Sequence, residues 1–205
     1  MHKLIILLAL LICLPARAGA QRDEPLSASV QAALYKSVSD GASPRLFFAS
    51  QTDANIWIAE MSRRLEKRMP DRIVRLDFLK TVNYEASRAG LDPQMVLGLI
   101  QVESGFKKYA VSNAGARGYM QVMPFWVKRI GTPDQDLFHI RTNLRYGCTI
   151  LRYYLDTEKG DLFRALGRYN GSLGRPEYPN MVISAWQNGW AYPSKISKAA
   201  SAPSS

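Results

Sequence analysis

The chain has 205 residues and a formal net charge of +10 at pH 7, with 27 lysines and arginines against 17 aspartates and glutamates. Two cysteines and two histidines are too few for a disulfide framework, and they form no cluster typical of a metal site. We therefore expect no metal and no cofactor. The basic charge favours an acidic partner, but alone it does not separate a wall polymer or a membrane surface from nucleic acid.

Residues 1–20 have the layout of a secretory signal peptide. A basic start precedes an apolar run from Leu4 to Leu14, and small residues follow as far as Ala20. The run is well short of the ~20 apolar residues that span a bilayer. We therefore expect cleavage near Ala18 or Ala20, export to the periplasm and no stable membrane insertion afterwards. Nucleic acid does not fit this compartment.

Cleavage would leave about 185 residues, enough for one domain that buries roughly 70% of the surface of its unfolded chain. It would also leave Cys148 as the last cysteine. Leucines at 144, 151 and 155 lie at helical spacing from this position. The pattern predicts that Cys148 is a small buried hydrophobic side chain.

Almost every segment after Ser27 is predicted to be helical, and no alternating strand pattern is convincing. Residues 30–50 are ambiguous, because they contain the turn signals DGASP. Three aspartates precede apolar periodic runs, which is the usual place of a helix N-cap. In chain order the predicted helices are a basic helix that ends at Pro70, one from Asp71 to Gly90 with Ile73 on its apolar face, one from Asp92 to Gly105, a short one from Pro124, and helices over 141–156, after Asp161 and over 180–188.

The helix predicted from Asp92 to Gly105 is apolar on most of its faces and yet ends in a glutamate, Glu103. Gly98 within it would let a neighbouring helix approach closely. A carboxylate in such a place loses hydration, which raises its pKa. A carboxylic acid that keeps its proton near neutral pH is what glycosidic cleavage requires, because the leaving oxygen must be protonated. The alternative is a structural glutamate on a solvated face, paired with Lys107 four residues later.

The segment from Lys107 to Gln121 is rich in glycine, serine and asparagine, which predicts a loop or short extended structure. Its glycines allow the backbone to approach a ligand closely. Hydroxyl and amide side chains occur here and again in the sequence RYNGS. Sugar sites combine such groups with flat aromatic or thioether surfaces. The candidate positions are Ser112, Asn113, Tyr119, Gln121, Tyr169, Asn170 and Ser172.

Four blocks of the sequence resemble the catalytic domain of the soluble lytic transglycosylases. The blocks are ESG at 103–105, VSNAGARGYMQVMP at 111–124, NLRYG at 143–147 and RYN at 168–170. They occur in the family's order and at similar spacing, which is more specific than any single block. The resemblance runs from about Arg72 to Trp190, and it implies a mainly α, lysozyme-like helical domain. It does not cover residues 21–69.

The resemblance also implies roles for single residues. The family's catalytic acid falls on Glu103, and Tyr169 matches the tyrosine near the reacting sugar. The positions that it places in contact with the glycan are Ser112, Gln121, Met123, Tyr169 and Asn170. Two residues depart from the family pattern, since Tyr119 stands where leucine is commoner and Arg168 replaces the usual alanine. Both flank matched residues, so they bear on subsite preference more than on activity.

The family's substrate is peptidoglycan, cut between N-acetylmuramic acid and N-acetylglucosamine. Most glycosidases use two carboxylates, but the matched loop between Phe106 and Thr132 contains none. A route with one carboxylate is therefore favoured. Glu103 protonates the leaving oxygen while the acetamido group of the substrate supports the developing positive charge. Glu103 then accepts the proton of the 6-hydroxyl of the same sugar, and ring closure gives a 1,6-anhydro end.

Two other functions remain open from the sequence. One is a hydrolase of the goose-type lysozyme kind, and the other is a non-catalytic peptidoglycan-binding component of an envelope machine. Peptidoglycan glycan strands are the expected partner, and no protein partner is predicted. The expected organisation is a signal peptide over 1–20, an N-terminal helical extension over 21–70, a catalytic domain over 71–190 and a polar, disordered tail over 191–205.

Overall fold

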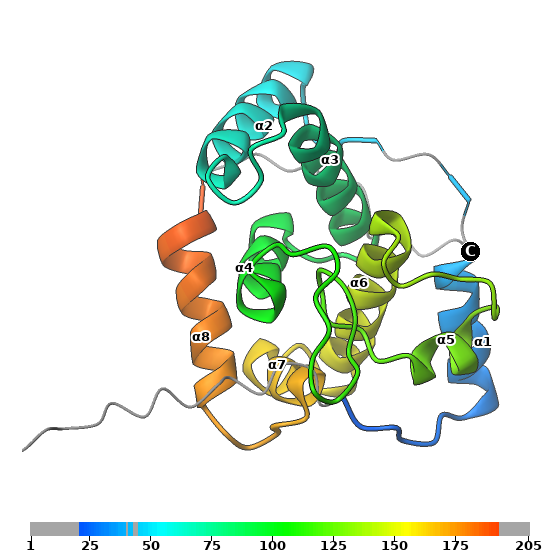
Figure 1. Ribbon diagram of the computed structural model, residues 1–205. Helices are drawn as coiled ribbons and strands as arrows, with labels where there is room; N and C mark the ends of the chain where they lie inside the picture. Colours follow the sequence, from blue (N-terminus) through cyan, green and yellow to red (C-terminus); the bar gives the residue numbers. More distant parts are fainter. Residues whose placement is uncertain (1–20, 40, 43–44, 193–205) are drawn as a thin grey trace, which may run out of the picture.

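The computed structural model describes residues 21–39, 41–42 and 45–192. The predicted signal peptide and nearly all of the predicted polar tail lie outside these residues. The described chain is mainly α, which confirms the predicted fold class (Figure 1). Its elements are α1 (Ala28–Val38), α2 (Gln51–Leu65), α3 (Arg72–Arg88), α4 (Pro93–Ser104), α5 (Phe125–Ile130), α6 (Ile140–Thr157), α7 (Leu162–Asn170), α8 (Glu177–Ala185) and the π-helical turn η1 (Trp186–Trp190).

Three helices begin at the aspartates that the sequence predicts as caps. The side chain of Asp71 accepts from the amide of Ile73 at 2.8 Å. Asp92 and Asp161 accept in the same way from the first turns of α4 and α7. These bonds satisfy amide groups that have no partner within the helix. The end of α4 is also as predicted, since Gly105 adopts a left-handed conformation with φ of 57°.

Two local predictions were wrong. Ile73 is 80% exposed, because it lies six residues before the buried Leu79, and helical neighbours on one face are three, four or seven residues apart. The last helix begins at Glu177 rather than at residue 180. Pro179 lies in its first turn, where the missing N–H of proline is not needed. The ambiguous region over 30–50 contains most of α1.

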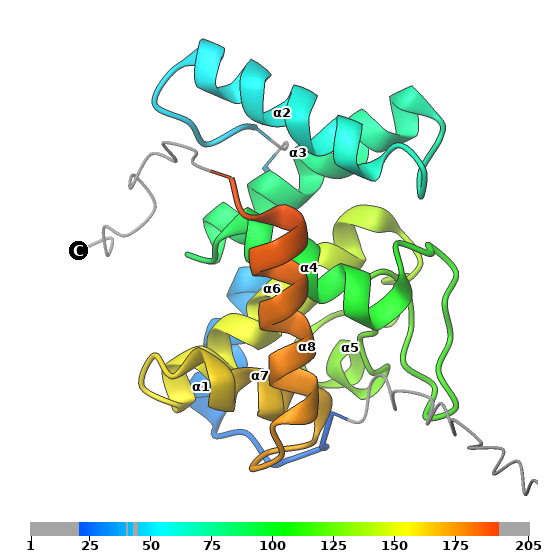
Figure 2. The ribbon, with the colours of Figure 1, turned by 90° about the vertical axis from the view of Figure 1, so that its left-hand side faces the viewer.

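Helix α4 lies at the centre of the domain (Figure 1). It packs against α3, α8 and η1, while α6 packs against α3 and α7. Helix α2 lies across α3, and α1 lies against α5 and α6. Figure 2 shows α8 and η1 running beside α4. The residues of α4 are buried on nearly every side, as its apolar sequence predicts.

The close approach predicted at Gly98 is present between α4 and η1. A Cβ atom at Gly98 would lie 2.8 Å from the backbone nitrogen of Trp186. A real Cβ does not tolerate such a contact, so the helices meet at a distance that only glycine permits.

A buried ionic cluster joins α3 to α6. Glu85 is fully buried, and Arg145 donates to both of its carboxylate oxygens, at 3.1 and 2.8 Å. Arg88 donates to the same carboxylate at 3.2 Å, and Arg141 lies 3.5 Å from it. Breaking a buried pair of this kind is costly, because it leaves charges without partners in a poorly solvated place. Cys148, also in α6, is buried as predicted.

Candidate active site

Glu103 lies one residue before the end of α4, with only 6% of its surface exposed. The predicted alternative, a solvated pair with Lys107, is wrong, because no ion pair joins the two residues and Lys107 is exposed. Burial raises the pKa of Glu103 to about 8. At neutral pH the side chain is therefore mainly the protonated carboxylic acid, and its pKa lies close to that pH.

The hydroxyl of Tyr178 donates to Oε1 of Glu103 at 2.5 Å. This bond favours the charged carboxylate and lowers the pKa of Glu103 against the larger effect of burial. Tyr178 is itself buried in α8, and burial next to Glu103 holds its own pKa well above the ordinary value. The second oxygen, Oε2, is buried and has no hydrogen-bond partner among the described residues. Tyr178 thus fixes one oxygen and leaves the other for a ligand atom.

Tyr169 lies near Glu103 at the end of α7. Its side chain is fully buried, and its hydroxyl donates to the carbonyl oxygen of Met120 at 2.8 Å. Burial raises its pKa well above the ordinary value, and the charge of Glu103 adds to the shift. Tyr169 therefore holds the backbone of the loop at Met120 in place near Glu103. The next residue, Asn170, donates to Ser172 Oγ at 3.1 Å, while its own Oδ1 is buried without a partner among the described residues.

The loop between α4 and α5 is fixed by polar contacts at several points. Ser104 Oγ donates to the carbonyl oxygen of Tyr119 at 2.8 Å, and Asn143 Oδ1 accepts from the amide of Met120 at 2.8 Å. The buried amide of Gln121 donates to the carbonyl oxygens of Ala110 and Gly118. The side-chain NH2 of Gln121 is therefore used within the loop.

The remaining predicted site residues lie in the same loop. Ser112 Oγ accepts from the amide of Ala116 at 3.1 Å, a bond within its own turn. Met123 is partly buried near the end of the loop. The structure thus brings together Glu103, Tyr169 and the backbone near Gln121. It gives Ser112 no contact with Glu103.

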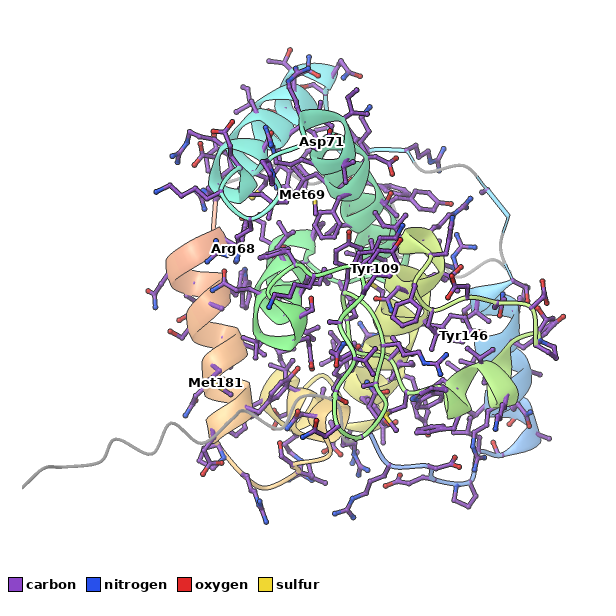
Figure 3. The ribbon with its side chains drawn as sticks, viewed as in Figure 1. Arg68, Met69, Asp71, Tyr109, Tyr146 and Met181 are labelled. Carbon is purple, nitrogen blue, oxygen red and sulfur yellow. The ribbon has the colours of Figure 1, made fainter. Side chains whose placement is uncertain are left out.

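A surface hollow of about 680 Å³ lies between α4 and the α8–η1 pair. Its walls include two residues of α4 that immediately precede Glu103. The size is that of typical small-ligand pockets, ~300–1,000 Å³. In Figure 3 the exposed side chains of Tyr109 and Met181 lie on either side of α4. The lining residues are Gln101, Val102, Asn180, Met181, Ser184, Ala185, Asn188 and Gly189.

Three further features of the described chain are the groups that could bind a metal, the helices that could span a membrane, and a second hollow. No group of three or more histidine, cysteine, aspartate or glutamate side chains in the described part could hold a metal ion. Within the same residues, no helix combines the length and the hydropathy that a membrane crossing requires. Another hollow, of about 620 Å³ between α1, α3 and α6, contains none of the predicted site residues.

Residues 80–178 match the family model described as the Transglycosylase SLT domain. Over these residues the chain is similar to that domain, which agrees with the sequence resemblance. The matched region begins in α3 and ends at Tyr178, so it includes Glu103, Tyr169 and the loop between them. It leaves out α1 and α2.

Curated relatives of similar sequence carry related names. The chain is 30% identical to the transglycosylase of Enterobacteria phage PRD1 over 60% of this chain and 43% of the relative. It is 49% identical to membrane-bound lytic murein transglycosylase C of Actinobacillus pleuropneumoniae serotype 5b (strain L20) over 23% of this chain and 13% of the relative. These matches span less than half of each relative. An inactive mutant of lytic transglycosylase Slt from Pseudomonas aeruginosa is 23% identical with a TM-score of 0.44, over 66% of this chain and 25% of that chain.

The sequence reasoning missed two residues that contact the site. Tyr178 is separated from Glu103 by 75 positions, and it lies two residues before the predicted start of the last helix. Gln21 contacts the backbone of Gln121 from 100 positions away. Neither residue lies in the resembling blocks, and no local spacing indicates these contacts.

Proposed function

We propose that this protein is a peptidoglycan lytic transglycosylase that acts on glycan strands in the periplasm after export. The observation that supports this most directly is the state of Glu103, a buried acid with a pKa of about 8. One of its oxygens is bound by Tyr178, and the other has no partner in the described chain. The match to a transglycosylase domain over residues 80–178 supports assigning this acid to that reaction class.

Glu103 acts first as a general acid and then as a general base. Protonated Oε2 faces the bond between N-acetylmuramic acid and N-acetylglucosamine and protonates the leaving oxygen as that bond breaks. The acetamido group of the substrate supports the positive charge at the anomeric carbon. The Tyr178 hydroxyl stabilises the carboxylate that forms on Glu103. That carboxylate takes the proton of the 6-hydroxyl, and the oxygen closes on the anomeric carbon to form the 1,6-anhydro end.

The surroundings of Glu103 favour this route over a hydrolytic one with two carboxylates. The group that Glu103 binds is the Tyr178 hydroxyl, and the loop between Phe106 and Thr132 contains no carboxylate. An inverting or retaining hydrolase needs such a partner within about 5–10 Å of its acid. The hydrolase would produce reducing ends, so the products distinguish the two reactions.

The remaining assignments are part of the same proposal. Residues 71–190 form the catalytic unit, and 21–70 are an extension that packs on it. The glycan lies along the loop after α4, where Ser112, Gln121 and Met123 line its path and Asn170 offers its unpaired Oδ1.

Digestion of purified sacculi, with the products identified by mass, tests the proposal. We expect the wild type to release anhydro-muropeptides and the Glu103→Gln variant to release none while it keeps its fold, as measured by circular dichroism. The control is Glu177→Gln, an exposed glutamate next to Tyr178, which should leave activity unchanged. Substantial activity in Glu103→Gln, or reducing ends from the wild type, would contradict the proposal.

A further inference from the structure

Gln21 lies in the segment before α1 and contacts the loop between α4 and α5, which is called the catalytic loop below. Its side chain is buried, with 4% of the residue exposed, although it lies far outside the matched region 80–178. Its Nε2 donates to the carbonyl oxygen of Gln121 at 3.3 Å. Its Oε1 accepts from the amide of Met123 at 3.2 Å and from the indole Nε1 of Trp126 at 3.0 Å. One amide thus makes two hydrogen bonds to the loop and one to Trp126 of α5.

The loop residues that Gln21 binds are next to the contacts of Tyr169. The Tyr169 hydroxyl donates to the carbonyl oxygen of Met120, the residue before Gln121. Gln121 has a φ of 49°, a left-handed conformation that is uncommon for residues other than glycine. The Gln21 amide also lies close enough to the Tyr169 hydroxyl to lower its pKa, against the larger effect of burial. Gln21 therefore lies near the Tyr169 hydroxyl and binds the residue that follows Met120.

The segment that contains Gln21 has other attachments to the domain. Asp23 forms an ion pair with Arg129, and Gln31 Nε2 donates to the carbonyl oxygen of Arg129 at 2.6 Å. Glu24 lies 3.7 Å from Arg168, the residue that replaces the family's usual alanine. These contacts lie at the surface and hold the segment without touching the catalytic loop. Other contacts therefore hold the segment on the domain without Gln21. The main effect of the buried Gln21 bonds is to fix the position of the loop.

We propose that Gln21 is a positioning residue of the active site. It fixes the backbone from Gln121 to Met123, and with it the Met120 carbonyl that holds Tyr169 beside Glu103. This inference rests on the proposed function and extends the site to a segment outside the matched domain. Its consequence is that the orientation of the loop, rather than the acidity of Glu103, depends on Gln21.

The test compares Gln21→Ala with Gln31→Ala in the full chain. For Gln21→Ala we expect kcat on sacculi to fall about tenfold, since small misplacements of catalytic groups slow reactions strongly. The pH at which kcat/KM declines should stay where it is in the wild type. Gln31→Ala removes a surface hydrogen bond between α1, which follows that segment, and α5, and it should lower kcat by less than about twofold. A drop in Gln31→Ala equal to that in Gln21→Ala, or no drop in either, would overturn the proposal.

A third variant, Gln21→Glu, separates positioning from loss of folding. Its carboxyl group matches the amide in shape, but it can donate to Gln121 only when protonated. We therefore expect activity that is low at pH 8 and recovers toward the wild-type level as the pH falls. A constant ratio to the wild type across pH would count against the assignment.

The Trp126 indole gives a measurement that does not depend on catalysis. Its N–H resonance should shift in Gln21→Ala and remain in place in Gln31→Ala. If the wild type released no anhydro ends but the resonance still moved, the proposed function would fail while the contact of Gln21 with the loop would stand. An unmoved resonance would remove the physical basis of the positioning role.

Discussion

Two buried glutamates of this chain lie in opposite surroundings. Glu85, between α3 and α6, is bound by Arg145 and Arg88 and lies near Arg141. Glu103, between α4 and α8, has no cationic partner among the described residues and is bound by a phenol. Both are nearly inaccessible to solvent.

The difference shows that burial alone does not identify a catalytic acid. Buried charge is tolerated where cations and hydrogen bonds replace water, as they do around Glu85. Without a cation, burial favours the neutral acid, and the pKa of Glu103 rises to about 8. The ion pairs of Glu85 join α3 to α6, whereas the surroundings of Glu103 keep its side chain protonated near neutral pH.

The largest effect on stability is expected from Glu85→Gln. The variant leaves buried arginines without an anion, and removal of one partner from a buried pair costs about 3–5 kcal/mol. Urea unfolding at pH 7 would measure this as a lower free energy of unfolding. A loss below about 1 kcal/mol would mean that the arginines find other partners or water, and the contrast with Glu103 would weaken.

Glu103→Gln should change stability in the opposite direction. In the unfolded chain Glu103 ionises near its ordinary pKa of 4.5, while in the folded protein it keeps its proton up to about 8. Wild-type stability therefore declines as the pH rises from 4.5 to 8. Glutamine does not titrate, so the variant escapes this decline and gains up to a few kcal/mol, at ~1.4 kcal/mol for each pKa unit.

Urea unfolding at pH 5 and pH 8 measures this gain. The difference between variant and wild type should be small at pH 5 and largest at pH 8. Glu177→Gln, at an exposed position, should show the same pH dependence as the wild type. A gain that is equal at both pH values would indicate that Glu103 titrates normally in the folded protein.

Of the three variants, Tyr178→Phe should change the protein least. It removes a single hydrogen bond to Glu103. The lost hydrogen bond stabilises the carboxylate form, so kcat should fall by about tenfold, the equivalent of ~1.4 kcal/mol. Removing the bond also raises the pKa of Glu103 further above 8. The decline of kcat/KM at alkaline pH should therefore move to higher pH. A shift to lower pH would mean that Tyr178 favours the protonated acid.

Local signals in the sequence predicted much of this structure. The aspartate caps of α3, α4 and α7, the glycine end of α4 and the burial of Cys148 each depend on a few neighbouring residues. The apolar surroundings of Glu103 follow from the composition of its own helix. These features could be predicted because their causes lie within one or two helical turns.

The rest depends on contacts between distant parts of the chain. Tyr178 meets Glu103 across 75 positions, and Gln21 meets Met123 across 102. The orientation of Gln121 could not be predicted either, since its amide turns toward Ala110 and Gly118 only in the folded loop. A pattern of residue types does not encode which distant groups meet, so the contacts of Glu103 were missed, although its burial was predicted from its own helix.

The contact at Gly98 has a mechanical consequence for the site. The backbone of α4 touches that of η1 with no side chain between them, and η1 directly follows α8, the helix of Tyr178. This close contact opposes sliding of α8 along α4. The hydrogen bond between Tyr178 and Glu103 therefore joins two helices whose relative position is fixed by backbone packing.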